Sequence, residues 1–184
     1  NAAGTWQLPL VIVINNNQWA ISVPIEQQTH SQTMAQKAIA AGIDCLQVDG
    51  NDVISVYEAT REAINKARQQ QGPTVIEAIT YRLCDHTTAD DASRYVPSNA
   101  LQEAKQNEPI SRLGYYLESQ KQWSVPQDKK LREQIAEKID YAVEQYLNTP
   151  KAPATDIIDY LYDTLPEAYY EQREEIEQIG GSNP

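Results

Sequence analysis

Three consecutive asparagines follow a short apolar segment near the start of the sequence. Val11 to Ile14 is a run of β-branched residues, typical of a strand buried on both faces, and Asn15, Asn16 and Asn17 come directly after it. An asparagine side-chain oxygen is a hard, neutral ligand that suits Mg²⁺ when phosphate supplies the negative charge, and a main-chain carbonyl two residues further on can complete such a site. The alternative is that these amides only cap the strand and hydrogen-bond a turn.

His86 is one of the two histidines in the chain, and it lies at the start of a polar segment. An imidazole whose pKa lies near neutrality can shuttle a proton or donate to a phosphate, so His86 is a candidate catalytic residue. The alternative is a loop histidine with no chemical role. The other histidine, His30, is expected to cap or contact a neighbour. Asp90 and Asp91 could form a metal pair, but adjacent acids in a loop more often accept backbone hydrogen bonds or pair with an arginine.

The elements that position these residues alternate between strands and helices. Segments 11–14, 44–50 and 73–80 have the pattern of buried parallel strands, and segments 33–41 and 52–70 have helical patterns that glycines end. This alternation predicts a βαβαβ unit with right-handed crossovers, which is half of a doubly wound α/β domain. Ligands bind beyond the carboxyl ends of such strands, where the asparagines lie.

The helix at 52–70 is expected to turn one apolar face toward the sheet. Its predicted inner face carries Val53, Val56, Tyr57, Thr60, Ile64 and Ala67.

The chain is expected to have two parts. Residues 1–108 form the α/β part, and they end in a polar segment, 84–108, whose length favours an active-site loop. Residues 109–184 form a helical extension that is rich in tyrosine and fits a subunit interface. Within this extension, helices are predicted at 109–123, 128–147, 156–162 and 167–179.

The composition argues against two classes of partner. With 26 acidic and 15 basic residues, the net charge is −11, which disfavours nucleic acid and anionic membranes. No apolar run reaches the roughly 20 residues of a membrane span, and the first residues do not have the pattern of a signal peptide. The two cysteines, Cys45 and Cys84, are expected to be buried as small apolar residues. So few thiols favour a reducing, cytoplasmic location.

Five segments of the sequence together resemble those of a known family. These segments are NNNQWAISVP, AQKAIAAGIDCLQVDGNDVISVYEATREA, GPTVIEAITYRL, DHTTADDASRY and EPISRLGYYLESQKQW. In this order and spacing they are similar to the α subunit of the heterotetrameric, thiamine-diphosphate-dependent 2-oxo acid dehydrogenases. The resemblance runs through essentially all 184 residues and implies the thiamine-diphosphate-binding α/β fold.

The resemblance implies roles for three residues. Mg²⁺ on the diphosphate of thiamine diphosphate would be held by the side chain of Asn17 and the main-chain carbonyl of Trp19. In the family a third ligand comes from a Gly-Asp-Gly motif, which lies further upstream than the 14 residues that precede Asn15. We therefore expect an upstream segment to be missing from this chain. His86 would contact the cofactor phosphates and take part in acyl transfer to lipoamide.

Two positions near this histidine depart from the family pattern, and a third occupies the place of a modified residue. Cys84 stands where the family usually has glycine, and Val96 follows Tyr95 where an arginine is common. A missing arginine weakens the ion pairs that order the loop, by about 1 kcal/mol or less if they are exposed, so we expect a more mobile loop. Thr87 occupies the place of a regulatory phosphoserine in mitochondrial members, which does not by itself imply phosphorylation.

The activity implied by the resemblance is decarboxylation of a 2-oxo acid, predicted to be pyruvate, and acyl transfer to lipoyl-lysine of an acyltransferase core. A branched-chain 2-oxo acid or acetoin dehydrogenase α subunit is the close alternative. A fragment that only docks other subunits is the alternative from a different class. The implied partners are a β subunit, in an α2β2 assembly that completes the active site, and the lipoyl domain. This chain alone is expected to be inactive.

Overall fold

A computed structural model describes residues 1–180 of the chain. The chain divides between Ser124 and Val125 into two compact units. The boundary expected between residues 108 and 109 therefore falls inside the first unit. Helix α4, Pro109–Ser119, belongs to that unit, where Arg112 of α4 forms an ion pair with Asp49 at the end of a strand.

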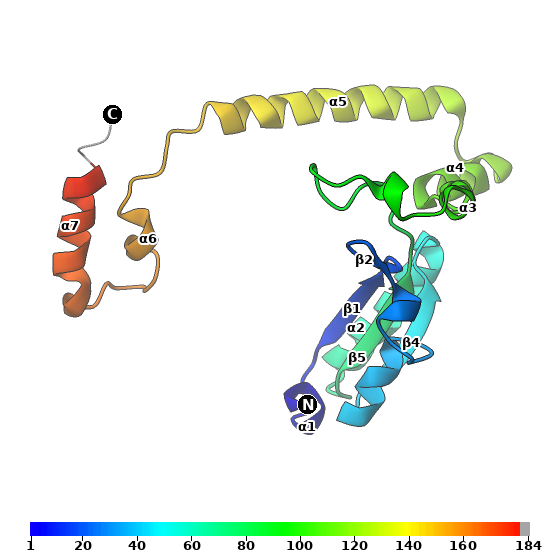
Figure 1. The fold of residues 1–184 in the computed structure, drawn as a ribbon, viewed down its shortest axis with the longest axis horizontal. Helices are drawn as coiled ribbons and strands as arrows, with labels where there is room; N and C mark the ends of the chain where they lie inside the picture. The colour runs from blue at the N-terminus through cyan, green and yellow to red at the C-terminus, as the bar shows by residue number, and fades with distance from the viewer. Residues whose placement is uncertain (181–184) are drawn as a thin grey trace. The chain divides into compact units, whose positions relative to one another are not determined.

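A three-stranded parallel sheet forms the centre of the first unit (Figure 1). Its strands are β1 (Val11–Asn16), β4 (Asp44–Asp49) and β5 (Thr74–Ile79), in the order β1-β5-β4. The register pairs Ile14 and Gln47 with Glu77 from either side. The predicted α/β fold with parallel strands is thereby confirmed, and the carboxyl ends of all three strands meet at one edge of the sheet.

The two faces of the sheet are covered by different elements. On one face, Val75 of β5 packs with Ala38 of the 3₁₀ helix η2 (Ala35–Ala41). On the opposite face, Ile76 of β5 packs with Ala59 and Ala63 of helix α2 (Val53–Arg68). Successive residues of a strand point to opposite sides, so β5 contributes to both small cores.

The face of α2 that packs on the sheet is not the one predicted. Ala59, Ala63 and Ala67 are buried, whereas Val53 and Tyr57 are 49% and 61% exposed. Only Ala67 of the predicted inner face is fully buried. Short alanine side chains at intervals of four residues let a helix approach a sheet closely, and this outweighs the larger apolar residues on the neighbouring face. Those larger residues line a groove of about 440 Å³ instead.

The strand that is buried on both faces is β5 and not β1. Residues 74 to 78 of β5 are all buried, while Val13 of β1 is 56% exposed. The reason is position in the sheet. Because β1 lies at the edge and β5 in the middle, only β5 is covered on all sides within this chain.

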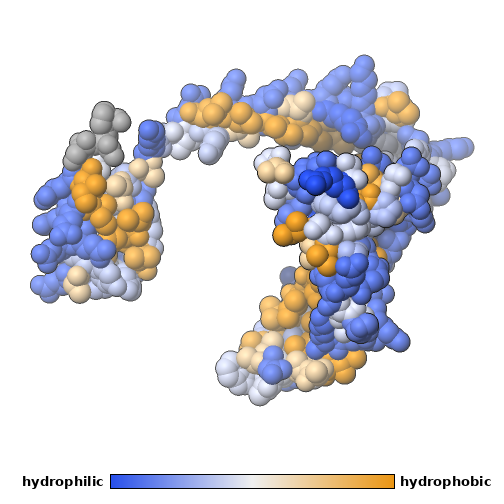
Figure 2. Space-filling model, in the orientation of Figure 1, coloured by the Kyte–Doolittle hydropathy of each residue, from blue (hydrophilic) through white to orange (hydrophobic). Residues whose placement is uncertain are grey.

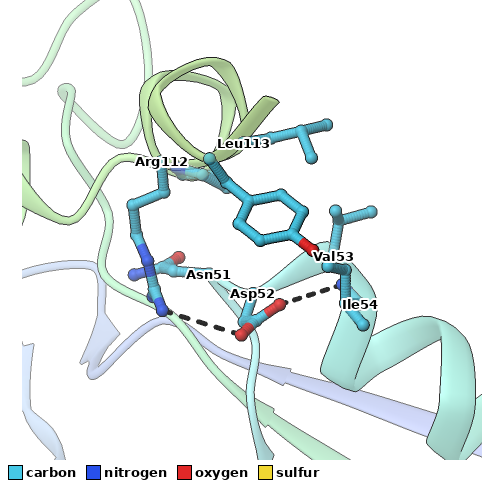
Figure 3. Close-up of a pocket in the computed structure, with 8 residues that line it drawn as sticks. Asn51, Asp52, Val53, Ile54, Arg112 and Leu113 are labelled. Carbon is cyan, nitrogen blue, oxygen red and sulfur yellow. Dashed lines mark hydrogen bonds and ion pairs between the residues drawn. The ribbon is translucent and has the colours of Figure 1, made fainter. Parts of the chain in front are cut away.

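Helix α2 begins at a side-chain cap. Asp52 accepts hydrogen bonds from the main-chain nitrogens of Ile54 and Ser55, at 2.9 and 3.2 Å. Figure 3 shows Arg112 of α4 reaching toward the same carboxylate, and the two lie 3.8 Å apart. Arg112 also donates to Asp49 at 2.8 Å. Although partial burial raises the pKa of Asp49, these contacts outweigh it and hold that pKa below its ordinary value.

The segment 84–108 is more ordered than predicted. It contains a short 3₁₀ helix, η3 (Ala92–Arg94), and helix α3 (Ser98–Gln106). The prediction of an irregular loop is therefore wrong for the second half of this segment. The smaller elements of the first unit are α1 (Ala2–Thr5), the hairpin strands β2 (Trp19–Ala20) and β3 (Val23–Pro24), and the 3₁₀ helix η1 (Ile25–Gln27).

The second unit is helical, as predicted, although its boundaries differ. Helix α5 spans Val125–Leu147, α6 spans Asp156–Asp159, and the 3₁₀ helix η4 (Glu167–Tyr169) leads into α7 (Tyr170–Gly180). Arg173 of α7 donates to both carboxylate oxygens of Asp159, at 2.6 and 3.2 Å, which lowers the pKa of that carboxyl. None of the helices in residues 1–180 is both long and apolar enough to span a membrane.

Candidate metal and cofactor site

The asparagine segment forms a turn at the carboxyl end of β1. The side-chain oxygen of Asn16 accepts from the main-chain nitrogen of Gln18 at 3.2 Å, and that of Asn17 accepts from the nitrogen of Trp19 at 3.0 Å. Gln18 has φ +70°, a conformation that these two side-chain contacts help to hold. These are the turn contacts that the alternative interpretation of the amides expects. A metal role for Asn17 is compatible with them, because an amide oxygen has a second lone pair.

Asn16 and Asn17 differ in their surroundings. Asn16 is buried and donates through Nδ2 to Glu77 Oε1 on the central strand, at 2.7 Å. The other oxygen of Glu77 accepts from the main-chain nitrogen of Ala35 at 2.9 Å. Burial raises the pKa of Glu77, but the hydrogen bonds from Ala35 and Asn16 outweigh it and lower that pKa below its ordinary value. Both oxygens accept from N–H groups, as those of a carboxylate do.

The oxygens of the turn fit a cation that brings its own counter-charge. A cavity of about 70 Å³ is lined by the three asparagines, Gln18 and Trp19. Among residues 1–180 no cluster of three histidine, cysteine or acidic side chains could hold a metal ion alone. Asn17 and the Trp19 carbonyl are neutral, hard ligands, so they suit Mg²⁺ whose charge is balanced by a diphosphate.

Trp19 anchors the turn to two tyrosines. The centroid of its ring lies 6.5 Å from that of Tyr81, in an edge-to-face arrangement, and 5.5 Å from that of Tyr95. In the β2–β3 hairpin its register partner is Pro24, which has no N–H to donate to the Trp19 carbonyl. The indole nitrogen of Trp19 is buried and has no hydrogen-bond partner in the described part of the chain.

A chain of hydrogen bonds orders the loop that follows β5. Arg82 donates to the Ile21 carbonyl and to the Tyr95 hydroxyl, both at 2.7 Å, and Tyr95 donates to Asp90 at 2.5 Å. The bond from Tyr95 lowers the pKa of Asp90, whereas burial and the Asp90 contact raise the pKa of Tyr95. Asp91 accepts from Ser93 at the start of η3. The two aspartates therefore make local hydrogen bonds, as expected.

His86 lies in this loop, and its main-chain nitrogen donates to Asp90 at 2.9 Å. The residue is exposed, and no hydrogen bond or ion pair to its imidazole occurs among the described residues. The ring contact between Trp19 and Tyr95 joins the loop to the asparagine turn. The structure thus links the predicted site residues through shared neighbours, and it leaves the imidazole of His86 accessible.

Two departures from the resemblance have structural consequences. Val96, in place of an arginine, is buried with 9% of its surface exposed, and the network of Arg82, Tyr95 and Asp90 forms without that arginine. A more mobile loop stays a prediction. Cys84 is exposed and Cys45 is half-buried, so the prediction that both are buried is wrong for Cys84, which lies in the loop after β5.

The sequence analysis missed the buried glutamate of the site. Glu77 lies within the segment that was predicted as a strand, but its role as partner of Asn16 was not recognised. The signal was available in the sequence, because a glutamate inside an apolar strand pattern is almost never buried without partners.

With this geometry established, comparison with known proteins identifies the class of the chain. The family model for the dehydrogenase E1 component matches residues 1–155. The chain belongs to this family.

Three similar proteins carry the same printed name, pyruvate dehydrogenase E1 component subunit alpha. The chain is 40% identical to the protein from Staphylococcus epidermidis and 39% identical to that from Bacillus subtilis, over 95% of this chain and 47% of each relative. It is 40% identical to the protein from Acholeplasma laidlawii, over 95% of this chain and 51% of the relative. The chain thus spans about half the length of the curated relatives that it matches.

Proposed function

We propose that this chain is part of the α subunit of a thiamine-diphosphate-dependent pyruvate dehydrogenase and supplies one part of its Mg²⁺ and cofactor site. The observation that carries the proposal is the turn at the end of β1, in which Asn17 and Trp19 present neutral oxygens beside a small polar cavity. Membership in the dehydrogenase E1 component family supports the choice of cofactor.

In this proposal each residue has a limited task. The Asn17 side-chain oxygen and the Trp19 main-chain carbonyl hold Mg²⁺, while His86 contacts the cofactor phosphates and the incoming lipoyl group. Thiamine diphosphate, when bound, supplies the electron sink for loss of carbon dioxide from a 2-oxo acid. The network of Arg82, Tyr95 and Asp90 keeps the loop that carries His86 against Trp19.

The substrate and the partners belong to the same proposal. The printed names of the relatives support pyruvate over a branched-chain 2-oxo acid or acetoin. A β subunit in an α2β2 assembly would complete the active site, and the lipoyl domain of an acyltransferase core would accept the acyl group. A cytoplasmic location is consistent with the free thiols of Cys45 and Cys84.

The test of the metal assignment is Asn17→Ala in the full-length α subunit assembled with its β subunit. The variant should bind Mg²⁺-thiamine diphosphate at least about tenfold more weakly in isothermal titration calorimetry, since losing even an indirect support of a metal site has an effect of this size. Asn65→Ala, at an exposed position on α2, is the matched control and should bind as the wild type does. Wild-type affinity in Asn17→Ala would refute the proposal.

Substrate identity is tested on the same assembly. Initial rates with pyruvate and with 3-methyl-2-oxobutanoate should favour pyruvate in kcat/KM. A preference for the branched-chain acid would assign the chain to the alternative enzyme.

A further inference from the structure

Glu77 is the most deeply buried charged residue in the described chain. Its solvent-exposed fraction is 0%, and it lies in the middle of β5, the central strand. Among the ion pairs of residues 1–180 none includes Glu77, so no cation compensates its charge. A buried carboxylate without a cation costs stability unless several donors satisfy it, so its retention in the core calls for a specific reason.

The donors to Glu77 come from two different elements. Asn16 at the end of β1 donates to one oxygen at 2.7 Å, and the Ala35 nitrogen at the start of η2 donates to the other at 2.9 Å. The nearby Met34 backbone and the side chain of Gln47 on β4 lower the pKa of this carboxyl further. Glu77 on β5 therefore joins the end of β1 to the start of η2.

The bond from Asn16 continues into the asparagine turn. Because Nδ2 of Asn16 is held by Glu77, its Oδ1 must face the other way, where it accepts from the nitrogen of Gln18. Gln18 in turn donates through its side chain to the Asn16 carbonyl at 3.2 Å. These contacts fix Gln18, the residue between Asn17 and Trp19.

We infer that Glu77 is a positioning residue, which orients the amide of Asn16 and thereby sets the turn that presents Asn17 and the Trp19 carbonyl to the cation. This inference rests on the proposed function. Glu77 does not touch the metal or the cofactor in this arrangement. It acts through Asn16 and Gln18. A neutral amide side chain at this position would have one acceptor oxygen and one donor nitrogen, so it could not accept hydrogen bonds from both Asn16 and Ala35.

Glu77→Gln shows why the charge matters. If the oxygen of the introduced glutamine accepts from Ala35, its amide nitrogen faces Nδ2 of Asn16, and two donors oppose one another. If Asn16 then rotates to offer its oxygen to that amide nitrogen, its Nδ2 faces the nitrogen of Gln18, and the turn loses its acceptor. Either arrangement leaves one buried donor unpaired, which is costly.

Asn16→Asp combined with Glu77→Gln exchanges donor and acceptor and restores the pattern. The aspartate accepts from both the glutamine nitrogen and the Gln18 nitrogen, and the glutamine oxygen accepts from Ala35. The single Asn16→Asp variant instead opposes two buried carboxylates, so it should be impaired. The double variant therefore separates the hydrogen-bond pattern from the identity of either side chain.

The experiment measures binding of Mg²⁺-thiamine diphosphate by isothermal titration calorimetry in the full-length α subunit assembled with its β subunit. Glu77→Gln and Asn16→Asp should each weaken binding about tenfold, the effect expected for loss of a hydrogen bond to a charged group, and the double variant should recover to within about threefold of wild type. Ile76→Val is the matched control, because it weakens the core on the opposite face of β5, where Ile76 packs against α2 and has no link to the turn. It should lower the melting temperature while leaving affinity within about twofold of wild type.

Three outcomes would overturn the inference. Wild-type affinity in a folded Glu77→Gln protein would show that Glu77 is only a core residue, and so would equal losses of affinity in Glu77→Gln and Ile76→Val. If Glu77→Gln does not fold, the double variant is the test. A folded double variant that does not recover affinity would refute the role of the hydrogen bonds from Glu77 through Asn16 to Gln18. The Asn17→Ala variant distinguishes this failure from that of the proposed function. If Asn17→Ala binds normally, the metal assignment itself fails. If Asn17→Ala binds weakly and Glu77→Gln binds normally, only the role of Glu77 is refuted.

Discussion

At the scale of single residues, His86 carries a prediction that separates fold from function. Its imidazole is exposed and has no side-chain partner among the described residues, so His86→Ala should leave the melting temperature unchanged. If the residue serves acyl transfer, the rate of reductive acetylation of a lipoyl domain should fall by about 10²- to 10⁴-fold, the range typical of a lost acid-base group. The measurement is transfer from pyruvate by the assembled α and β subunits.

The other histidine provides the control for this prediction. His30 is also exposed and lies in a polar segment away from the loop that carries His86. His30→Ala should acetylate the lipoyl domain at the wild-type rate. Equal rates in both variants would remove His86 from its assigned role.

At the scale of elements, the loop after β5 depends on one hydroxyl group. The Tyr95 hydroxyl accepts from Arg82 and donates to Asp90, and it joins η3 to the end of β5. Tyr95→Phe keeps the ring contact with Trp19 but breaks both bonds, so the loop should open more often. Limited proteolysis with trypsin measures this opening, because Arg94 directly precedes Tyr95.

Cleavage after Arg94 should be about tenfold faster in Tyr95→Phe, the equivalent of losing net stabilisation by one to two hydrogen bonds. Tyr115→Phe, at an exposed position on α4, is the control and should be cut at the wild-type rate. Unchanged cleavage in Tyr95→Phe would mean that contacts other than the Tyr95 hydroxyl hold the loop.

The elements also show which parts of the fold the sequence could predict. The strand at 74–79 was predictable because its pattern is apolar apart from Thr74 and Glu77, and the parallel direction of the strands followed from the alternation of strands and helices. The inner face of α2 was not, because the apolar pattern continues around the helix and only the alanine spacing marks the side that meets the sheet. Helix α3 was hidden in a polar segment whose composition resembles a loop.

The same limit applies to the site. Asn17 and Trp19 could be proposed because a resemblance assigns them roles, and the structure places them in one turn. The link from Asn16 to Glu77 joins residues 61 positions apart. Spacing along the chain contains no signal for that pairing, which depends on the register of β1 against β5. A glutamate in an apolar strand predicts that a hydrogen-bond partner exists, but only the three-dimensional structure identifies that partner.

At the scale of the whole molecule, the distribution of exposed apolar residues differs from that of a self-contained protein. Helix α5 has no buried residue, and it carries Leu131, Ile135, Ile139 and Val143 on one face with exposures between 41% and 56%. Figure 2 shows hydrophobic residues in a band along this helix. Contiguous apolar surface of this kind marks an interaction site, or a tendency to associate when no partner is present.

The band on α5 should therefore drive self-association of the chain when it is expressed alone. Ile135→Lys places a charge within the band, and sedimentation velocity should show less concentration-dependent association than the wild type. Gln134→Lys adds the same charge at the neighbouring position outside the band, so it should associate as the wild type does. Because both variants change the net charge equally, a difference between them isolates the apolar face. Equal association in all three proteins would instead assign the contact to another surface, such as the exposed groove of α2 that Val53 and Tyr57 line.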